Sequence, residues 1–292
     1  MSKVLISGSI AYDTIMNFHD RFTNYIMPQH IHTLSVNFNI NEMVRYNWWT
    51  AQNIGYALKK CGWDPLLVSS VWTDFQQPEQ CKWIDFSHVA TSKTSLTAQA
   101  TIITDENNNQ ITAFYPWASG EWLEPSLENL LDEVSYAIVS PNNPQTMLRH
   151  TRDLWSSNIL FFFDPGQPLS AFTTTQLHEV MKLAPYLVVN EYEKDLFCKI
   201  AQIWFDDLIM SFEKVIVTLW EQGVEVRSWP DLMKFNAYSV EKVIDPTWAW
   251  DAFRWGLLGW LSSGMSWIDA IDQWQKLASL CVQTKGTIER DI

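Results

Sequence analysis

The stretch ILFFFDPG, residues 159–166, decides the fold because it is one of four similar runs in the middle of the chain. Each run begins with apolar residues and closes on polar or turn-forming ones, a pattern typical of a buried strand that ends at a loop. The four runs are YAIVSP (136–141), ILFFFDPG (159–166), YLVVNEYE (186–193) and KVIVTLWEQG (214–223). Helical patterns separate them. Strands that alternate with helices predict an α/β fold with a central, mainly parallel sheet flanked by helices.

The polar residues that close these strands are candidates for a functional site. In open parallel sheets the ligand lies beyond the carboxyl ends of the strands. The candidates are Asp13, Asp164, Asn190, Glu193, Thr218 and the segment 245–251.

The N-terminal third adds further predicted elements. An opening strand covers about residues 3–10, a helix residues 50–62 and a short strand residues 65–71. Residues 30–46 alternate enough to suggest extended structure, and residues 97–115 read as a hairpin around a polar turn. No repeat or linker divides the chain, so we expect a single domain over 1–292, with an appended sheet built from the early hairpins.

Composition narrows the classes of function. The net charge of −13 argues against a nucleic-acid partner, since binding to phosphate backbones needs clustered Lys and Arg. No apolar run approaches the roughly 20 residues of a membrane span, and the N-terminus lacks the layout of a signal peptide. The four cysteines lie far apart, which favours a reducing cytoplasm over a disulfide framework or zinc site.

The stretch DPTWAWDAFRWGLLGW, residues 245–260, predicts a helix that begins near residue 249. The free amides of its first turn would point at any bound anion, and the helix dipole adds to that attraction. Asp251 lies in this first turn. A carboxylate there could accept a hydroxyl proton during phosphoryl transfer, or it could merely cap the helix.

The segment DPTWAWDAF (245–253) resembles the D-P-T-G-A-G-D-A-F signature of the ribokinase-like family, the phosphofructokinase-B type of sugar and nucleoside kinases. Other motifs follow the family's order over nearly the whole chain. They are LISGSIAYDTI (5–15), NWWTAQNIGYALKKCGWDPLLVSSVWTDF (47–75), FDPGQ (163–167), NEYE (190–193) and VTLWEQG (217–223). The segments GSIAYDTI (8–15) and NNNQITAFYP (107–116) look closest to the bacterial adenosine-kinase-like branch.

The resemblance implies a role for each matching position. Asp251 would be the catalytic base, with Trp248, Ala249 and Trp250 completing the anion hole of residues 248–251. The positions that would hold the sugar hydroxyls are Asp13, Trp48, Trp49 and Asn53. Thr218, Trp220 and Gly223 would line the ATP site, and Asn190 and Glu193 would organise Mg²⁺ and phosphate. Segments near 13–46 and 94–117 would form a β lid over the sugar.

Competing motifs are weak. The chain has no G-x-x-x-x-G-K-[ST] loop and no G-x-G-x-x-G turn after a strand. His30 and His32 could place two imidazoles on one strand face, but no third metal ligand accompanies them.

The tryptophans are anomalous. A chain of this length would carry about 20 glycines at the usual frequency, whereas this one has 10 glycines and 17 tryptophans. Positions 48, 49, 72, 220, 248 and 250 are glycine in the family motifs and tryptophan here. Five more tryptophans fall where a small residue is usual: Trp63, Trp83, Trp117, Trp255 and Trp260. Overpacking at about 1–3 kcal/mol each over ten or so sites would exceed the roughly 5–15 kcal/mol of total stability.

Random drift in a dead kinase would introduce a mixture of residues and would also damage Asp13, Asn190 and Asp251, which are intact. We therefore hypothesise that UGA codons meaning glycine in the source organism are translated here as tryptophan. The sequence then predicts an ATP-dependent kinase that phosphorylates a primary hydroxyl, with adenosine favoured as acceptor. The alternatives are a pseudokinase that serves as an interaction protein, and a kinase for ribose, fructose or another nucleoside. We expect small-molecule substrates, no nucleic-acid or membrane partner, and a monomer or homodimer.

Overall fold

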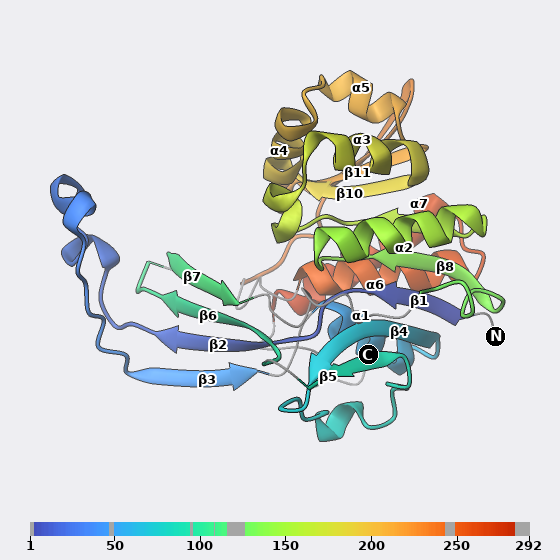
Figure 1. Ribbon diagram of the computed structural model, residues 1–292. Helices are drawn as coiled ribbons and strands as arrows, with labels where there is room; N and C mark the ends of the chain where they lie inside the picture. The colour runs from blue at the N-terminus through green and yellow to red at the C-terminus, as the bar shows by residue number, and fades with distance from the viewer. Residues whose placement is uncertain are drawn as a thin grey trace.

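The computed structural model describes residues 3–46, 50–93, 96–107, 109–115, 126–242 and 249–283. Within them the central feature is a nine-stranded sheet in the order β13-β12-β11-β10-β9-β8-β1-β4-β5 (Figure 1). Its strands are β1 (Lys3–Ser7), β4 (Asp64–Trp72), β5 (Val89–Ser92), β8 (Val134–Val139), β9 (Leu160–Phe163), β10 (Tyr186–Asn190), β11 (Lys214–Thr218), β12 (Val224–Ser228) and β13 (Asp231–Phe235).

The pairing confirms the predicted mainly parallel sheet. From β5 through β11 each strand runs parallel to its neighbours, and only β12 and β13 at the far edge pair antiparallel. The strands predicted at 136–141, 159–166, 186–193 and 214–223 correspond to β8, β9, β10 and β11. Their carboxyl ends therefore share one edge of the sheet.

Helices cover both faces of this sheet, and each face has its own apolar core. On one face α1 (Thr50–Lys60), α6 (Ala249–Ser262) and α7 (Trp267–Cys281) contribute to the first core. On the other face the second core includes residues of α2 (Pro144–Ser156), α3 (Thr174–Leu183), α4 (Glu191–Ala201) and α5 (Phe205–Met210). Strand β9 shows the alternation: Phe162 enters the first core, and Phe161 and Phe163 enter the second.

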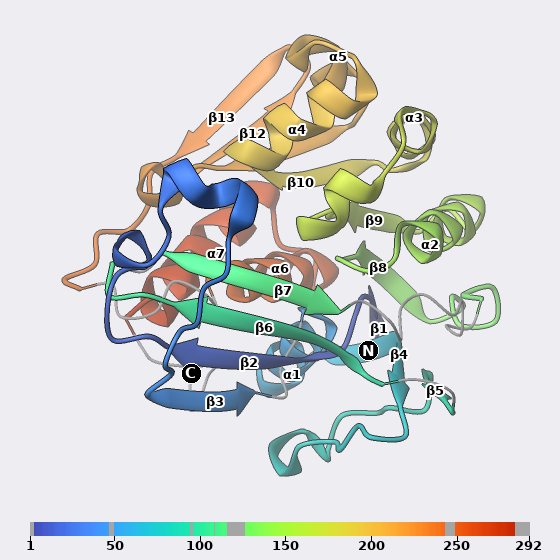
Figure 2. The same cartoon turned by 60° about the vertical axis from the view of Figure 1, so that its left-hand side comes forward.

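A smaller four-stranded sheet, in the order β3-β2-β6-β7, projects from the main body (Figures 1 and 2). It consists of β2 (Ala11–Asn17), β3 (Glu42–Tyr46), β6 (Ala98–Thr104) and β7 (Gln110–Tyr115). The predicted hairpin at 97–115 is confirmed as the antiparallel pair β6–β7. The opening strand is shorter than predicted, because β1 ends at Ser7 and the chain then enters the smaller sheet as β2.

The prediction of extended structure over 30–46 is wrong in its first half. Two short 3₁₀ helices, Phe22–Asn24 and Pro28–Thr33, occupy the connection between β2 and β3, and the strand begins only at Glu42. Pro28 at the first position of the second helix presets a helical φ. Residues 34–41 pair with none of the strands in the described part of the chain, so alternation alone is not enough to make them a strand.

Candidate functional site

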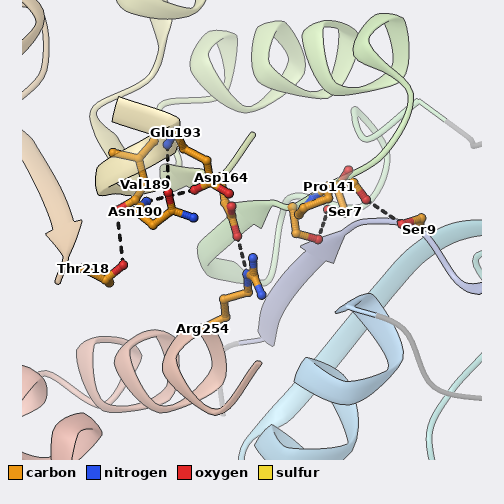
Figure 3. A network of polar contacts seen from close by, with 10 residues as sticks. Ser7, Ser9, Pro141, Asp164, Val189, Asn190, Glu193, Thr218 and Arg254 are labelled. Carbon is orange, nitrogen blue, oxygen red and sulfur yellow. Dashed lines mark hydrogen bonds and ion pairs between the residues drawn. The ribbon is translucent and has the colours of Figure 1, made fainter. Parts of the chain in front are cut away.

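Asn190 and Glu193 meet at the junction of β10 and α4, where they form a reciprocal capping box (Figure 3). The Glu193 backbone N–H donates to Asn190 Oδ1 at 2.8 Å, and the Asn190 backbone N–H donates to Glu193 Oε2 at 2.9 Å. Each side chain therefore satisfies a backbone group at the start of α4. The Asn190–Glu193 pair therefore stabilises the start of α4 independently of any ligand.

The Glu193 carboxyl lies in a site that disfavours its charge. Burial raises its pKa above the ordinary value, and the negative charge of Asp164 raises it further. The bond from the Asn190 N–H and the positive charge of Arg254 act in the opposite direction. Glu193, in the first turn of α4 after β10, and Asp164, directly after the neighbouring strand β9, are thus two carboxylates close enough to interact.

Asp164 forms an ion pair with Arg254, through Oδ2 and Nε (Figure 3). Their side chains are 3% and 12% exposed, so the pair is largely buried. The Asp164 N–H donates to Val139 O at 2.9 Å, which ties the end of β9 to β8. Because Arg254 belongs to α6, the pair connects that helix to the carboxyl edge of the sheet. Sequence reasoning missed Arg254, although a lone cation in an apolar helix three residues after Asp251 was an available signal.

Thr218 closes β11 directly beside Asn190, to which it is paired in register. Its hydroxyl donates to Val189 O at 3.5 Å. The turn that follows is irregular: Trp220 has φ = 54° and Gly223 has φ = 91°. A Cβ on Gly223 would lie 2.0 Å from Phe235 O, so this position requires glycine.

Helix α6 begins at Ala249, as the sequence predicts. Trp250 and Asp251 are its second and third residues, which places both in the first turn. The side chains of Ala249, Trp250 and Asp251 lie outside the described part of the structure, and so does Trp248. The catalytic base and anion hole therefore stay predictions, supported by the position of the helix start.

The residues predicted to hold the acceptor come from two different elements. Asp13 lies near the start of β2 in the smaller sheet, and Asn53 lies in the first turn of α1; both are buried. Trp48 and Trp49 fall outside the described residues. The connection from β1 to β2 is held against the segment that follows β8 and against α1, because Ser9 Oγ donates to Pro141 O at 2.6 Å and the Ala51 N–H donates to Ser9 O at 3.4 Å.

The tryptophans in the described part of the structure differ in their packing, hydrogen bonding and backbone conformation. Trp63 and Trp260 pack edge to face at 5.8 Å between ring centres, and a Cβ on Gly259 would lie 2.4 Å from the Trp63 ring. Trp72 is fully buried, and its indole N–H has no hydrogen-bond partner within the described structure. Trp220 holds a left-handed φ, which is rare for a bulky residue. The last two occupy family glycine positions.

The described residues contain no cluster of three or more His, Cys, Asp or Glu that could hold a metal by protein ligands alone. His30 and His32 lie in a 3₁₀ helix rather than a strand, with ring centres 6.5 Å apart. Among the described helices none has the length and apolar character needed to cross a bilayer.

Comparison with known proteins agrees with this geometry. The profile of the pfkB family carbohydrate kinases matches residues 50–291. A nucleoside kinase of Methanocaldococcus jannaschii is 27% identical over 263 residues, 88% of this chain and 83% of that protein. The solved structure of a Burkholderia thailandensis nucleoside kinase in complex with ADP-inosine is 34% identical, with a TM-score of 0.84 over 97% of this chain and 90% of that one. A ribokinase from Cryptococcus neoformans, at 18% identity and a TM-score of 0.79, shares the fold over 99% of this chain and 96% of its own.

Proposed function

Because the chain belongs to the pfkB family of carbohydrate kinases, we propose that it transfers the γ-phosphate of ATP to the primary hydroxyl of a purine nucleoside, with adenosine as the first acceptor to test. Family membership and the nucleoside kinase relatives make it a phosphotransferase that acts on a sugar or nucleoside hydroxyl. The choice of a nucleoside over a free sugar rests on those relatives. The inosine in the Burkholderia complex makes inosine the second acceptor to test.

The observation that carries the proposal is the placement of the start of α6 at the carboxyl edge of the sheet. The Asp164–Arg254 pair joins that helix to the end of β9, next to β10 and β11. An anion at the helix start would meet unpaired backbone N–H groups and the positive end of the helix dipole. Those groups can stabilise the charge that develops on a phosphoryl group in transfer.

Each predicted residue has a role in this scheme. Asp251 would accept the proton of the attacking hydroxyl, and residues 248–251 would supply the anion hole. Asp13 and Asn53, with positions 48 and 49, would bind and orient the ribose hydroxyls. Thr218, position 220 and Gly223 would line the nucleotide site after β11.

Glu193 and Asn190 fit a Mg²⁺ ion held jointly with nucleotide phosphates. Mg²⁺ in such sites uses one or two carboxylates together with phosphates and water. The Glu193 carboxyl, whose pKa burial and Asp164 both raise, would be stabilised in its charged form by a nearby cation. The bound ion would neutralise phosphate charge during transfer.

The proposal requires glycine at positions 48, 49, 220, 248 and 250. Two indoles at 248 and 250 would fill the space that the transferring phosphate needs. Trp220 supports the recoding hypothesis, because its φ of 54° lies in the region that glycine occupies without strain. Trp72 also supports the recoding hypothesis, because its indole N–H is buried without a hydrogen-bond partner in the described structure, which costs about 1–3 kcal/mol.

The test compares two proteins: the chain as written and a version with glycine at 48, 49, 72, 220, 248 and 250. Formation of ADP is measured with adenosine, inosine, ribose and fructose, and thermal stability with and without saturating ATP. We expect the glycine version alone to convert adenosine and ATP into AMP and ADP. The coding DNA provides an independent check, because UGG at 48, 49, 220, 248 and 250 would rule out recoding.

Two other results would change the conclusion. A glycine version that ATP stabilises but that prefers ribose or fructose would make the chain a sugar kinase with the same chemistry. A glycine version with no turnover and no ATP-induced stabilisation would support the pseudokinase, and the search would then turn to protein partners.

A further inference from the structure

The loop that follows β4 contacts both strands by which the chain enters the smaller sheet. The first contact is with Tyr12 in β2. Its hydroxyl donates to the backbone oxygen of Asp74 at 3.0 Å and accepts from the Gln76 N–H at 3.1 Å. Tyr12 is buried, its ring lies 6.0 Å from that of Phe75, and the guanidinium of Arg45 in β3 lies 3.9 Å from the ring centre.

The second contact is with Thr97, immediately before β6. The Asp74 carboxylate accepts both the Thr97 N–H, at 3.0 Å, and the Thr97 hydroxyl, at 2.6 Å, through the same oxygen. The Thr97 hydroxyl oxygen in turn accepts from the backbone N–H of Trp72 at 3.2 Å. Thr97 is fully buried. One residue of the main body, Asp74, therefore binds β2 through its backbone and the start of β6 through its side chain.

We propose that Tyr12, Asp74 and Thr97, here called the clasp, are positioning residues that hold Asp13 in place for the acceptor. The inference rests on the proposed function, in which Asp13 binds the ribose hydroxyls. Tyr12 directly precedes Asp13, and the parallel register pairs Ala11 with Ala98 and Asp13 with Ala100. Fixing Tyr12 and Thr97 thus fixes β2, the strand that carries Asp13, and its parallel neighbour β6.

The clasp acts on one side of the site only. The residues of the nucleotide side come from the nine-stranded sheet and its helices, and the hydrogen bonds described above for Asn190, Glu193, Thr218 and Arg254 do not involve Asp74. Both bonds from Thr97 go to a charged acceptor, and such bonds are stronger than those between neutral groups. Losing the two bonds to the Asp74 carboxylate should loosen the smaller sheet without moving Asn190, Glu193 or Thr218.

Hydrogen exchange of the ligand-free chain tests this positioning role without any substrate. The variants are Asp74→Ala, which removes the carboxylate, Asp74→Asn, whose amide oxygen can still accept both bonds, and Tyr12→Phe. The control is Asp85→Ala, because Asp85 accepts the Ser87 N–H at 2.8 Å within its own turn, and the charged groups that act on it, His88 and Lys3, lie outside the smaller sheet. We expect amides of 11–17 and 98–104 to exchange at least about tenfold faster in Asp74→Ala, since about 1.4 kcal/mol corresponds to tenfold. Tyr12→Phe and Asp74→Asn should show smaller rises, the second because the amide oxygen keeps both bonds without the charge, and Asp85→Ala should match the parent.

The kinetic arm uses the glycine version of the enzyme. Asp74→Ala should raise the KM for the nucleoside about tenfold and leave the KM for ATP unchanged, and the KM of Asp74→Asn for the nucleoside should lie between those of the parent and Asp74→Ala. Unchanged exchange in Asp74→Ala, or an equal rise in both KM values, would overturn the positioning role. A parent that binds no nucleoside would instead overturn the proposed function, so the two failures are distinguishable.

Discussion

The two sides of the candidate site are built differently. On the proposed nucleotide side, Asp164, Asn190 and Thr218 close three neighbouring strands of one sheet, and α6 is tied to the same edge through Arg254. On the proposed acceptor side, Asp13 comes from the smaller sheet and Asn53 from α1. The polar contacts of the nucleotide side are internal to one body, whereas the acceptor side is assembled across two sheets.

This difference predicts different responses to mutation. A substitution within the buried network of the nucleotide side leaves a partner unsatisfied inside the main body, so it should lower the stability of the fold. A substitution on the acceptor side leaves the main body intact, so it should lower affinity for the acceptor. Free energy of unfolding and KM therefore report on the two sides separately.

The largest effect on stability is expected for Arg254→Met. The substitution leaves the Asp164 carboxylate buried without its cation, and breaking a buried pair in this way costs about 3–5 kcal/mol. The measurement is urea unfolding at neutral pH. The double variant Asp164→Asn with Arg254→Met should regain most of the loss, because no unpaired charge remains.

The matched control is Arg152→Met. Arg152 pairs with Glu179 through two bonds of 2.6 and 2.8 Å, but the arginine side chain is 54% exposed. An exposed pair contributes about 1 kcal/mol or less. Equal losses of unfolding free energy in Arg254→Met and Arg152→Met would contradict the claim that the residues of the nucleotide side form a buried, mutually dependent network.

Much of the nucleotide side could be predicted from the sequence. The strand endings at Asp164, Asn190 and Thr218 follow apolar runs whose period and length identify buried strands. A parallel sheet then brings such endings to one edge, so local patterns are enough to place them. The start of α6 at Ala249 was predictable for the same reason.

The next largest effect is expected on the acceptor side, in the KM for adenosine. Asp13→Asn in the glycine version should raise the KM for adenosine by about tenfold to a hundredfold, because a hydrogen bond to a charged group contributes about 1.5–3 kcal/mol. Its unfolding free energy and its KM for ATP should stay close to the parent values. A large loss of stability with an unchanged KM for adenosine would show that Asp13 is structural.

The acceptor side could not be assembled from sequence in the same way. The contacts of Asp74 with Tyr12 and Thr97 join residues 62 and 23 positions apart, between sheets whose mutual placement no periodicity encodes. The same holds for Arg254 and Asp164, 90 positions apart. At Pro28–Thr33 the alternating pattern and the proline favour different structures, and the proline at the first position of the 3₁₀ helix prevails.

A smaller gain in stability is expected at the turn after β11. Trp220→Gly should raise the free energy of unfolding by about 1 kcal/mol, since left-handed backbone costs a bulky residue about 1–2 kcal/mol and the side chain is 63% exposed, so little apolar burial is lost. Thermal and urea unfolding measure the change.

Gln202→Gly provides the comparison, because Gln202 has φ = 57° at the end of α4 and matches no glycine of the family motifs. Both substitutions should stabilise the fold, but only Trp220→Gly should also strengthen ATP binding in a protein with glycine at 248 and 250. Similar effects of both substitutions on ATP binding would mean that glycine at position 220 acts only by relieving backbone strain.

The smallest effect depends on pH and concerns Glu193→Gln. The pKa of Glu193 is raised in the folded protein, first by burial and then by the charge of Asp164. Its contribution to stability is therefore fully present below its unfolded pKa of about 4.3 and is lost as the pH rises through the folded pKa. Glutamine stays neutral and can still accept the Asn190 N–H, so the variant should match the parent near pH 4 and have the higher Tm at pH 7. A Tm that is lower at pH 7 would mean that the charge itself stabilises the fold.

The same variant of the glycine version should need more Mg²⁺ for half-maximal rate, which separates the ligand role of the carboxylate from its role in the capping box.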